Sequence, residues 1–172
     1  MPITDIDKLK SMAEDTTTHK KLVMDNCYLM FKWLADHDQL QMGIDLLKRG
    51  SVHDNSKFNA DEFKRMAMIL KSRDCFTNAD NQLSPEEIRA IEAHWAKNRH
   101  HPEYFESSSD MTELDMIEMV CDWFARSRQY GTDFIPFVKE RQKNRFRFDK
   151  PQFDFILKYC TLIEKLYLED NI

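Results

Sequence analysis

TELDMIEMVCDWFARSRQ, residues 112–129, is the stretch that decides the fold class. Thr112 followed by Asp115 is the capping pattern of a helix start, and the apolar residues after it recur at helical spacing. They are Leu114, Ile117, Met119, Val120, Trp123 and Phe124. The stretch therefore predicts an amphipathic helix, and Asp122 lies inside it.

The composition of the whole chain extends this prediction to an all-α fold. With 172 residues, of which 42% are hydrophobic, the chain has the size and the apolar content of one domain with a single core. It has only 3 Gly and 5 Pro, too few for the many turns of a sandwich or a barrel of short strands. We therefore expect a single-domain bundle of about six to eight helices.

Other segments have the same helical periodicity. Helices are expected over 4–14, 16–34, 40–48, 60–71, 84–98, 133–144 and 151–169. Gly50 is expected to end the third of these, and residues 73–82 are expected to form a loop. Ser84 and Pro85, followed by two glutamates, form a strong helix start.

The charge and the apolar runs of the chain exclude several classes of protein. A net charge of −5 gives no general attraction for duplex nucleic acid, and no apolar run approaches the ~18 residues of a membrane span. The N-terminus lacks the layout of a signal peptide. The four cysteines contain no C-x-x-C pair, so free thiols of a reducing compartment are expected. These features predict a soluble cytoplasmic protein that binds neither duplex nucleic acid nor a membrane.

The stretch RQKNRFRFDK, residues 141–150, leaves two interpretations open. Its five cations alternate with Phe146 and Phe148, a composition that suits phosphate or RNA binding. The end of an amphipathic helix with buried phenylalanines explains it equally well.

Histidines and aspartates form the pattern that indicates chemistry. In chain order they are His19, His53, Asp54, His94, His100, His101 and Asp122. Each lies on or beside a different predicted helix, and divalent transition metals bind this mixture of imidazole and carboxylate inside helical bundles. A single histidine is usually an ordinary core or surface residue, so the prediction of a metal site rests on the ordered set. His37, in a polar loop, has no place in the set and is expected at the surface.

The order His, His-Asp, Asp resembles the HD superfamily of metal-dependent phosphohydrolases. The continuation of the doublet, His53-Asp54-Asn55-Ser56-Lys57, matches the HD-x-[GS]-K form of that superfamily. The extra histidines resemble those of members with two or three metals, such as the HD-GYP phosphodiesterases and the di-iron oxygenases of this fold. The segments HDNSKF, HWAKNRHHPEY and CDWFARS also resemble a family of small bacterial and phage proteins from which no substrate can be carried over.

The resemblance implies roles for individual residues. It makes His19, His53, Asp54 and Asp122 the ligands of a first metal, and Asp54 a bridge to a second. His94, with one or both of His100 and His101, would complete the second site. Lys57 would hold a phosphoryl oxygen of the substrate, so the resemblance makes Lys57 and Asp54 the candidate catalytic residues.

Residues beside these motifs are candidates for supporting roles. Glu118 and Asp115 share a helix face with Asp122, and either is a partner for a metal-binding histidine or a solvated rim residue, the latter favoured for Asp115. Asn98, Arg99 and Tyr104 are candidates to bind substrate beside the second histidine cluster.

Two departures limit the prediction of substrate. The sequence has no Gly-Tyr-Pro after its His-His pair, so the cyclic dinucleotide contacts of the HD-GYP group are not implied. It also lacks the glutamate that nucleotidase-type members place just after the doublet, since Lys57 occupies that region.

The function expected from the resemblance is hydrolysis of a phosphomonoester or phosphodiester of a nucleotide or small phosphorylated molecule. Two divalent metals per chain are expected, drawn from Mn, Fe, Co, Ni and Zn, or Mg. A di-iron oxygenase and a metal-containing protein that sequesters or senses a ligand are the alternatives. The domain is expected to span residues 1–172, with the metal site in a core over 16–128 and helices over 133–169 packed on it.

Overall fold

The longest helix, α1 (Ile3–Asp36), runs unbroken because residues 3–36 contain neither glycine nor proline. The separate helices expected over 4–14 and from Thr16 are one helix, and that part of the prediction was wrong. Helix α1 is already buried at Met12, which is 3% exposed, one turn before the apolar segment begins near Thr16.

The computed structural model describes residues 3–70, 84–146 and 148–170. These ranges contain seven α-helices and no strand, which confirms the predicted all-α class. The other α-helices are α2 (Leu40–Val52), α3 (Ala60–Leu70), α5 (Pro85–Trp95), α6 (Glu113–Tyr130), α7 (Phe134–Arg141) and α8 (Lys150–Asp170). Short turns are η1 (Asn55–Phe58), η2 (Pro102–Tyr104), η3 (Ser108–Asp110) and the π-helical η4 (Gln142–Phe146). The loop expected over 73–82 and Cys75 lie outside the described residues.

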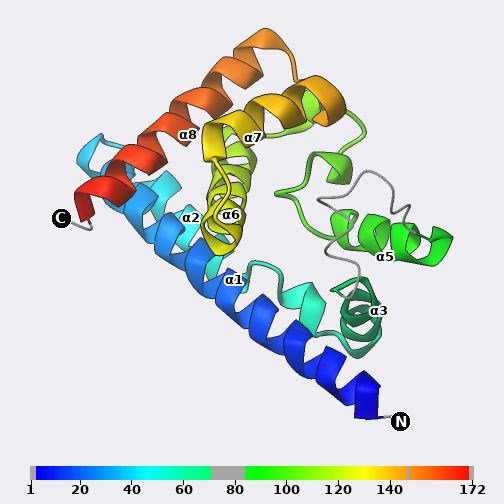
Figure 1. Ribbon diagram of the computed structural model, residues 1–172. Coiled ribbons are helices and arrows are strands. Elements are labelled where there is room, and N and C mark those ends of the chain that lie inside the picture. Colours follow the sequence, from blue (N-terminus) through cyan, green and yellow to red (C-terminus); the bar gives the residue numbers. More distant parts are fainter. Residues whose placement is uncertain (1–2, 71–83, 147, 171–172) are drawn as a thin grey trace.

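Helix α6 is the centre of the bundle. It contacts α1, α2, α7 and α8, and Figure 1 shows it between the long N-terminal helix and the C-terminal pair. Its start is the predicted capping box, in which the Thr112 hydroxyl accepts a hydrogen bond from the Asp115 N–H. Because α6 is packed on several sides, its acids Asp115, Glu118 and Asp122 are all buried and need partners.

Helices α3 and α5 pack against each other at one side of the bundle (Figure 1). The predicted start of α5 is confirmed, since Ser84 and Glu87 form a reciprocal capping box with Pro85 in the first turn. The helix ends at Trp95, three residues before the predicted end. The residues after it form the turn that carries His100 and His101.

The segment between α7 and α8 packs against tryptophans of α5 and α6. The Phe146 ring stacks on Trp123 with 5.3 Å between centroids, and Phe148 is buried. The Arg145 guanidinium lies 4.3 Å from the Trp95 ring centroid and bonds to Glu103. Of the two interpretations of residues 141–150, packing therefore accounts for Arg145, Phe146 and Phe148.

Gly50 lies inside α2 and does not end it, contrary to the prediction. A Cβ atom at Gly50 would lie 2.9 Å from the Cys27 Sγ on α1, so the absence of a side chain allows the two helices to approach closely. The close approach places His53, which follows α2, beside His19 of α1.

Gly50→Ala is expected to lower the free energy of unfolding by about 1–3 kcal/mol, the usual cost of overfilling a packed contact. Urea unfolding of wild type and variant measures the loss. Ser51→Ala, one residue later on the exposed face of α2, is the matched control and should change it by less than about 0.5 kcal/mol. Equal stability of Gly50→Ala and wild type would show that the helices have room to separate.

Candidate metal centre

The seven side chains of the predicted ligand set come together at one place in the bundle. His19 lies in the middle of α1, His53 and Asp54 in the turn after α2, and Asp122 on α6. His94 lies in the last turn of α5, and His100 and His101 lie in the turn before η2. All except the half-buried His101 are 6% exposed or less.

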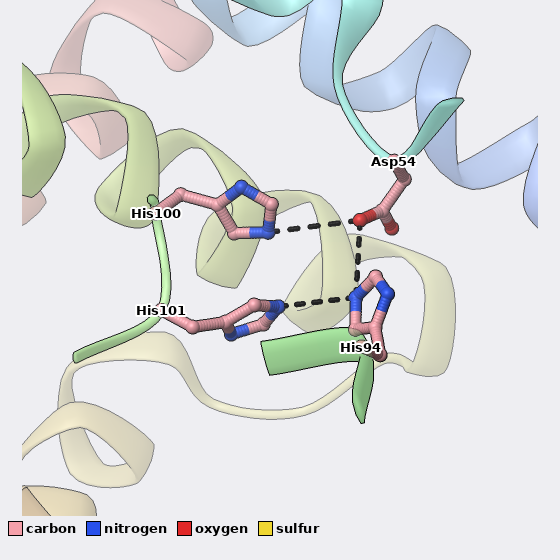
Figure 2. A group of neighbouring side chains, drawn as sticks. All are labelled: Asp54, His94, His100 and His101. Atoms are coloured by element: carbon pink, nitrogen blue, oxygen red, sulfur yellow. Dashed lines mark hydrogen bonds and ion pairs between the residues drawn. The ribbon is translucent and has the colours of Figure 1, made fainter. Parts of the chain in front are cut away.

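Three histidines surround one oxygen of Asp54. Asp54 Oδ1 lies 3.2 Å from His94 Nε2 and 3.6 Å from His100 Nε2. His101 Nε2 is 3.2 Å from His94 Nε2. Figure 2 shows these four side chains pointing toward one another, and one ligand atom from each lies within 4.8 Å of the others.

His19, His53 and Asp122 form a second group beside the other oxygen of Asp54. His19 Nε2 is 2.8 Å from Asp122 Oδ1, and His53 Nε2 is 3.8 Å from the same oxygen. Asp54 Oδ2 lies 3.9 Å from His19 Nε2 and 3.7 Å from His53 Nε2. The two oxygens of Asp54 therefore face two different groups of ligands.

The backbone at Asp54 is adapted to this position. Asp54 has φ 54° and ψ 17°, the left-handed conformation, in the turn between α2 and η1. Few residues other than glycine, asparagine and aspartate adopt it readily. The turn therefore presents the carboxylate of Asp54 from a short, sharply bent connection.

The donor atoms fit metal ions. His19 Nε2, His53 Nε2, Asp54 Oδ1 and His100 Nε2 are buried and make no hydrogen bond. Buried polar atoms without partners are costly, and convergent imidazole and carboxylate atoms are the ligands of divalent transition metals. These buried groups can therefore hold metal ions.

Glu118 orients two of the histidines. Its Oε1 lies 3.2 Å from His53 Nδ1 and 3.4 Å from His100 Nδ1. With a proton on each Nδ1, both imidazoles donate to Glu118 and keep the lone pair of Nε2 for the centre. Of the two roles open to Glu118, the structure supports that of a partner to metal-binding histidines.

Glu62 orients His94 in the same way. The sequence analysis did not identify this residue. Its Oε1 lies 2.8 Å from His94 Nδ1, and it accepts hydrogen bonds from Ser56 and Lys97. An acid in the first turn of a helix normally complements the helix dipole, so the sequence offered no signal for this role.

A family model matches residues 8–165 and is described as "Family of unknown function (DUF5662)". The chain belongs to this family. No curated protein and no solved structure is significantly similar to it. Among the helices that the structure describes, none has both the length and the apolar character needed to cross a membrane.

The charges around the centre are set by these contacts. Burial raises the pKa of Glu118, but hydrogen bonds from His100 and His53 outweigh it and lower the pKa to about 2. Burial lowers the pKa of His19 to about 3, assisted by the positive charge of Arg126. At neutral pH, Glu118 is therefore ionised and His19 is a neutral imidazole, the form that binds metals.

The four candidate substrate-binding residues occupy different positions. Lys57 is 5% exposed and its ammonium bonds to Asp54 Oδ2, at the centre itself. The Asn98 amide donates to Ser56 Oγ and to the carbonyl of His94. Tyr104 is 39% exposed, and the Arg99 guanidinium lies 5.4 Å from its ring centroid.

A cavity of about 170 Å³ adjoins two of the histidines. His53, His100 and Glu118 line it together with Asn98 and Arg99, whereas Lys57 and Tyr104 do not. Asn98 and Arg99 therefore border a space that reaches the centre, and Tyr104 lies farther out.

His37 and the described cysteines lie outside the cluster of histidines and acids. His37 is exposed and stacks on Trp33, as expected for a surface residue. Cys27, Cys121 and Cys160 are buried free thiols.

Asp115 is not the solvated rim residue that the sequence favoured. It is fully buried and bonds to Arg49 of α2 and, through both oxygens, to Arg99. Because Arg99 precedes His100, this carboxylate ties the histidine-bearing turn to α6. Burial raises the pKa of Asp115, but hydrogen bonds from Arg99, Thr112 and Arg49 lower it below its usual 3.8.

Asp115→Asn is expected to lower the free energy of unfolding at neutral pH by about 1–3 kcal/mol, since it replaces a buried carboxylate that two arginines and Thr112 bond to by a weaker, neutral acceptor. A carboxyl with a lowered pKa stabilises the fold above its unfolded pKa, and this contribution is lost as the pH falls through the folded pKa. The difference between wild type and variant should therefore shrink below pH 3.8.

Urea unfolding across this pH range measures the difference. Asp45→Asn, which removes an exposed pair with Lys48, is the control and should leave stability nearly unchanged at neutral pH. If the difference in the free energy of unfolding between wild type and Asp115→Asn stays constant from neutral to acid pH, Asp115 has no ionic role.

Proposed function

We propose that this protein is a metal-dependent phosphohydrolase with a dinuclear centre, which cleaves a phosphate ester of a nucleotide or a small phosphorylated molecule. The observation that carries the proposal is the position of Asp54, whose two oxygens face separate groups of imidazole ligands. A carboxylate in this position is suited to bridge two ions. The HD-x-S-K form of His53 to Lys57 adds the resemblance to known phosphohydrolases.

Each ion has its own set of ligands. His19, His53 and Asp122 would hold one together with Asp54 Oδ2, and the three remaining histidines would hold the other with Asp54 Oδ1. Sets rich in imidazole favour Mn, Fe, Co, Ni or Zn over Mg. A pair of such ions supplies an activated water and stabilises the leaving oxygen in phosphate ester hydrolysis.

The side chains around the centre favour an anionic substrate. Two divalent ions would balance Asp54, Asp122 and the two glutamates that contact the histidines, and Lys57 adds a further buried cation beside them. Lys57 is the cation in contact with the bridging carboxylate, so it is placed to bind a phosphoryl oxygen as a point charge. A phosphate ester offsets this excess of positive charge.

The di-iron oxygenase remains the competing function, because the same imidazole and carboxylate ligands suit iron. Metal identity and oxygen consumption separate the two. If the centre holds only iron and consumes oxygen with an organic substrate, the protein is an oxygenase and the proposed hydrolase function is wrong.

Metal content tests the dinuclear centre. Wild type purified without chelator should carry about two metals per chain, as a bridging carboxylate between two ligand sets requires. The His94→Ala/His100→Ala variant should keep about one, held by the His19 group.

Asp54→Ala should retain well under the metal content of wild type and lose activity, whereas His37→Ala should match wild type in both. Full metal content in Asp54→Ala would show that the ligand set is wrong.

Lys57→Ala separates binding of substrate from binding of metal. Removing one preorganised charge is expected to lower kcat by about a hundredfold while the metal content stays unchanged. Steady-state kinetics on a phosphomonoester, with metal analysis of the same samples, measures both. Loss of metal in parallel with activity would make Lys57 a structural residue.

A further inference from the structure

The contact between Arg126 of α6 and Asp15 of α1 lies one helical turn beyond the metal centre. On α6 Arg126 follows Asp122 by four residues, and on α1 its partner Asp15 precedes His19 by four. The pairs His19 with Asp122 and Asp15 with Arg126 therefore form two neighbouring contacts between the same helices, at 2.8 Å and 3.5 Å.

One end of the Arg126 side chain is held in place. Its Nη1 lies 3.1 Å from Tyr130 Oη, 3.3 Å from Gln129 Oε1 and 3.5 Å from Asp15 Oδ2. These contacts all run through Nη1, and the side chain is 27% exposed. The guanidinium is thus held through one nitrogen and is partly open to solvent, where an anion can reach it.

A purely structural role explains these contacts poorly. Gln129 already connects α6 to Asp15 with a hydrogen bond of 2.6 Å, shorter than any contact of Arg126 Nη1. Gln129 therefore provides a second contact between the two helices at Asp15, beside that of Arg126.

The charge of Arg126 lies near the centre, and its ion-pair partner is Asp15, outside the ligand set. It interacts electrostatically with Asp122 and Asp54, the two carboxylates of the ligand set, yet bonds to neither. Lys57, which bonds to Asp54 Oδ2, is a second cation beside this half of the centre.

We propose that Arg126 binds the phosphoryl group of a phosphomonoester dianion at the His19 and Asp122 half of the centre, together with Lys57. This inference rests on the proposed function and narrows it. The planar fork of arginine matches two oxygens of one phosphate, and a terminal phosphate offers three such oxygens. A monoester carries about two negative charges near neutral pH, whereas a diester carries one, so two added cations favour the monoester.

Binding of inorganic phosphate to the metal-loaded full chain, measured by titration calorimetry, tests the inference without requiring turnover. Arg126→Gln is expected to weaken phosphate binding at least tenfold with unchanged metal content, the scale of one lost charged contact. Arg126→Lys keeps the charge and loses the fork, so it should bind with intermediate affinity. Arg128→Gln is the matched control, because Arg128 is a half-buried arginine of the same helix that lies over the Tyr167 ring at 4.1 Å.

Kinetics on p-nitrophenyl phosphate and bis(p-nitrophenyl) phosphate distinguish the two ester classes. Arg126→Gln should raise KM for the monoester at least tenfold and change hydrolysis of the diester by less than about threefold. Wild type should prefer the monoester, and Arg128→Gln should behave as wild type on both.

Each remaining outcome counts against a specific claim. Wild-type phosphate affinity in Arg126→Gln, or equal weakening by Arg128→Gln, would overturn the role of Arg126 and leave the hydrolase intact. Loss of metal in Arg126→Gln would make the residue structural. If Arg126→Gln does not fold, Arg126→Lys decides, since full phosphate affinity in that variant excludes recognition by the fork. A metal-loaded wild type that binds no phosphate and cleaves neither ester would overturn the proposed function itself.

Discussion

The carboxylate of Asp54 is the group on which the architecture depends. It is 2% exposed and lies among four histidines and the ammonium of Lys57. An isolated buried carboxylate is strongly unfavourable, so the surrounding helices must bring compensating groups to it. α1, α5, the turn after α5 and α6 each contribute a residue that meets this requirement or shares the centre. The packing of the helices and the positions of the histidines and acids around Asp54 therefore depend on each other.

Three buried carboxylates that are not part of the candidate ligand set hold the histidines in position. Glu118 and Glu62 receive the Nδ1 side of three histidines, which leaves the Nε2 atoms directed at the centre. Asp115 holds the turn that carries His100 through Arg99. Three acids that do not touch the central carboxylate thus decide the orientation and the protonation of the imidazoles that do.

The sequence was sufficient for the features that depend on local chemistry. Helix starts at Ser84 and Thr112 follow from capping residues, and the cluster that could hold metal ions was indicated by histidines next to acids in a known order. Features that depend on packing between distant segments were not accessible. Gly50 looks like a helix terminator until the contact with Cys27 is known. Glu62 looks like an ordinary acid of a first turn until His94 is found 2.8 Å away, and Arg126 has no motif at all.

The left-handed backbone at Asp54 restricts how the site can change over evolutionary time. Most substitutions there would disturb both the charge balance and the turn, so they would be removed by selection for folding alone. Asparagine is the exception, because it tolerates the same backbone conformation and has nearly the same shape while lacking the charge. A single exchange of oxygen for an amide nitrogen would thus keep the turn while removing the negative charge that Lys57 and the histidines surround. Relatives that keep the helices but bear asparagine at this position would be the natural place to look for members whose histidine cluster has lost its central negative charge.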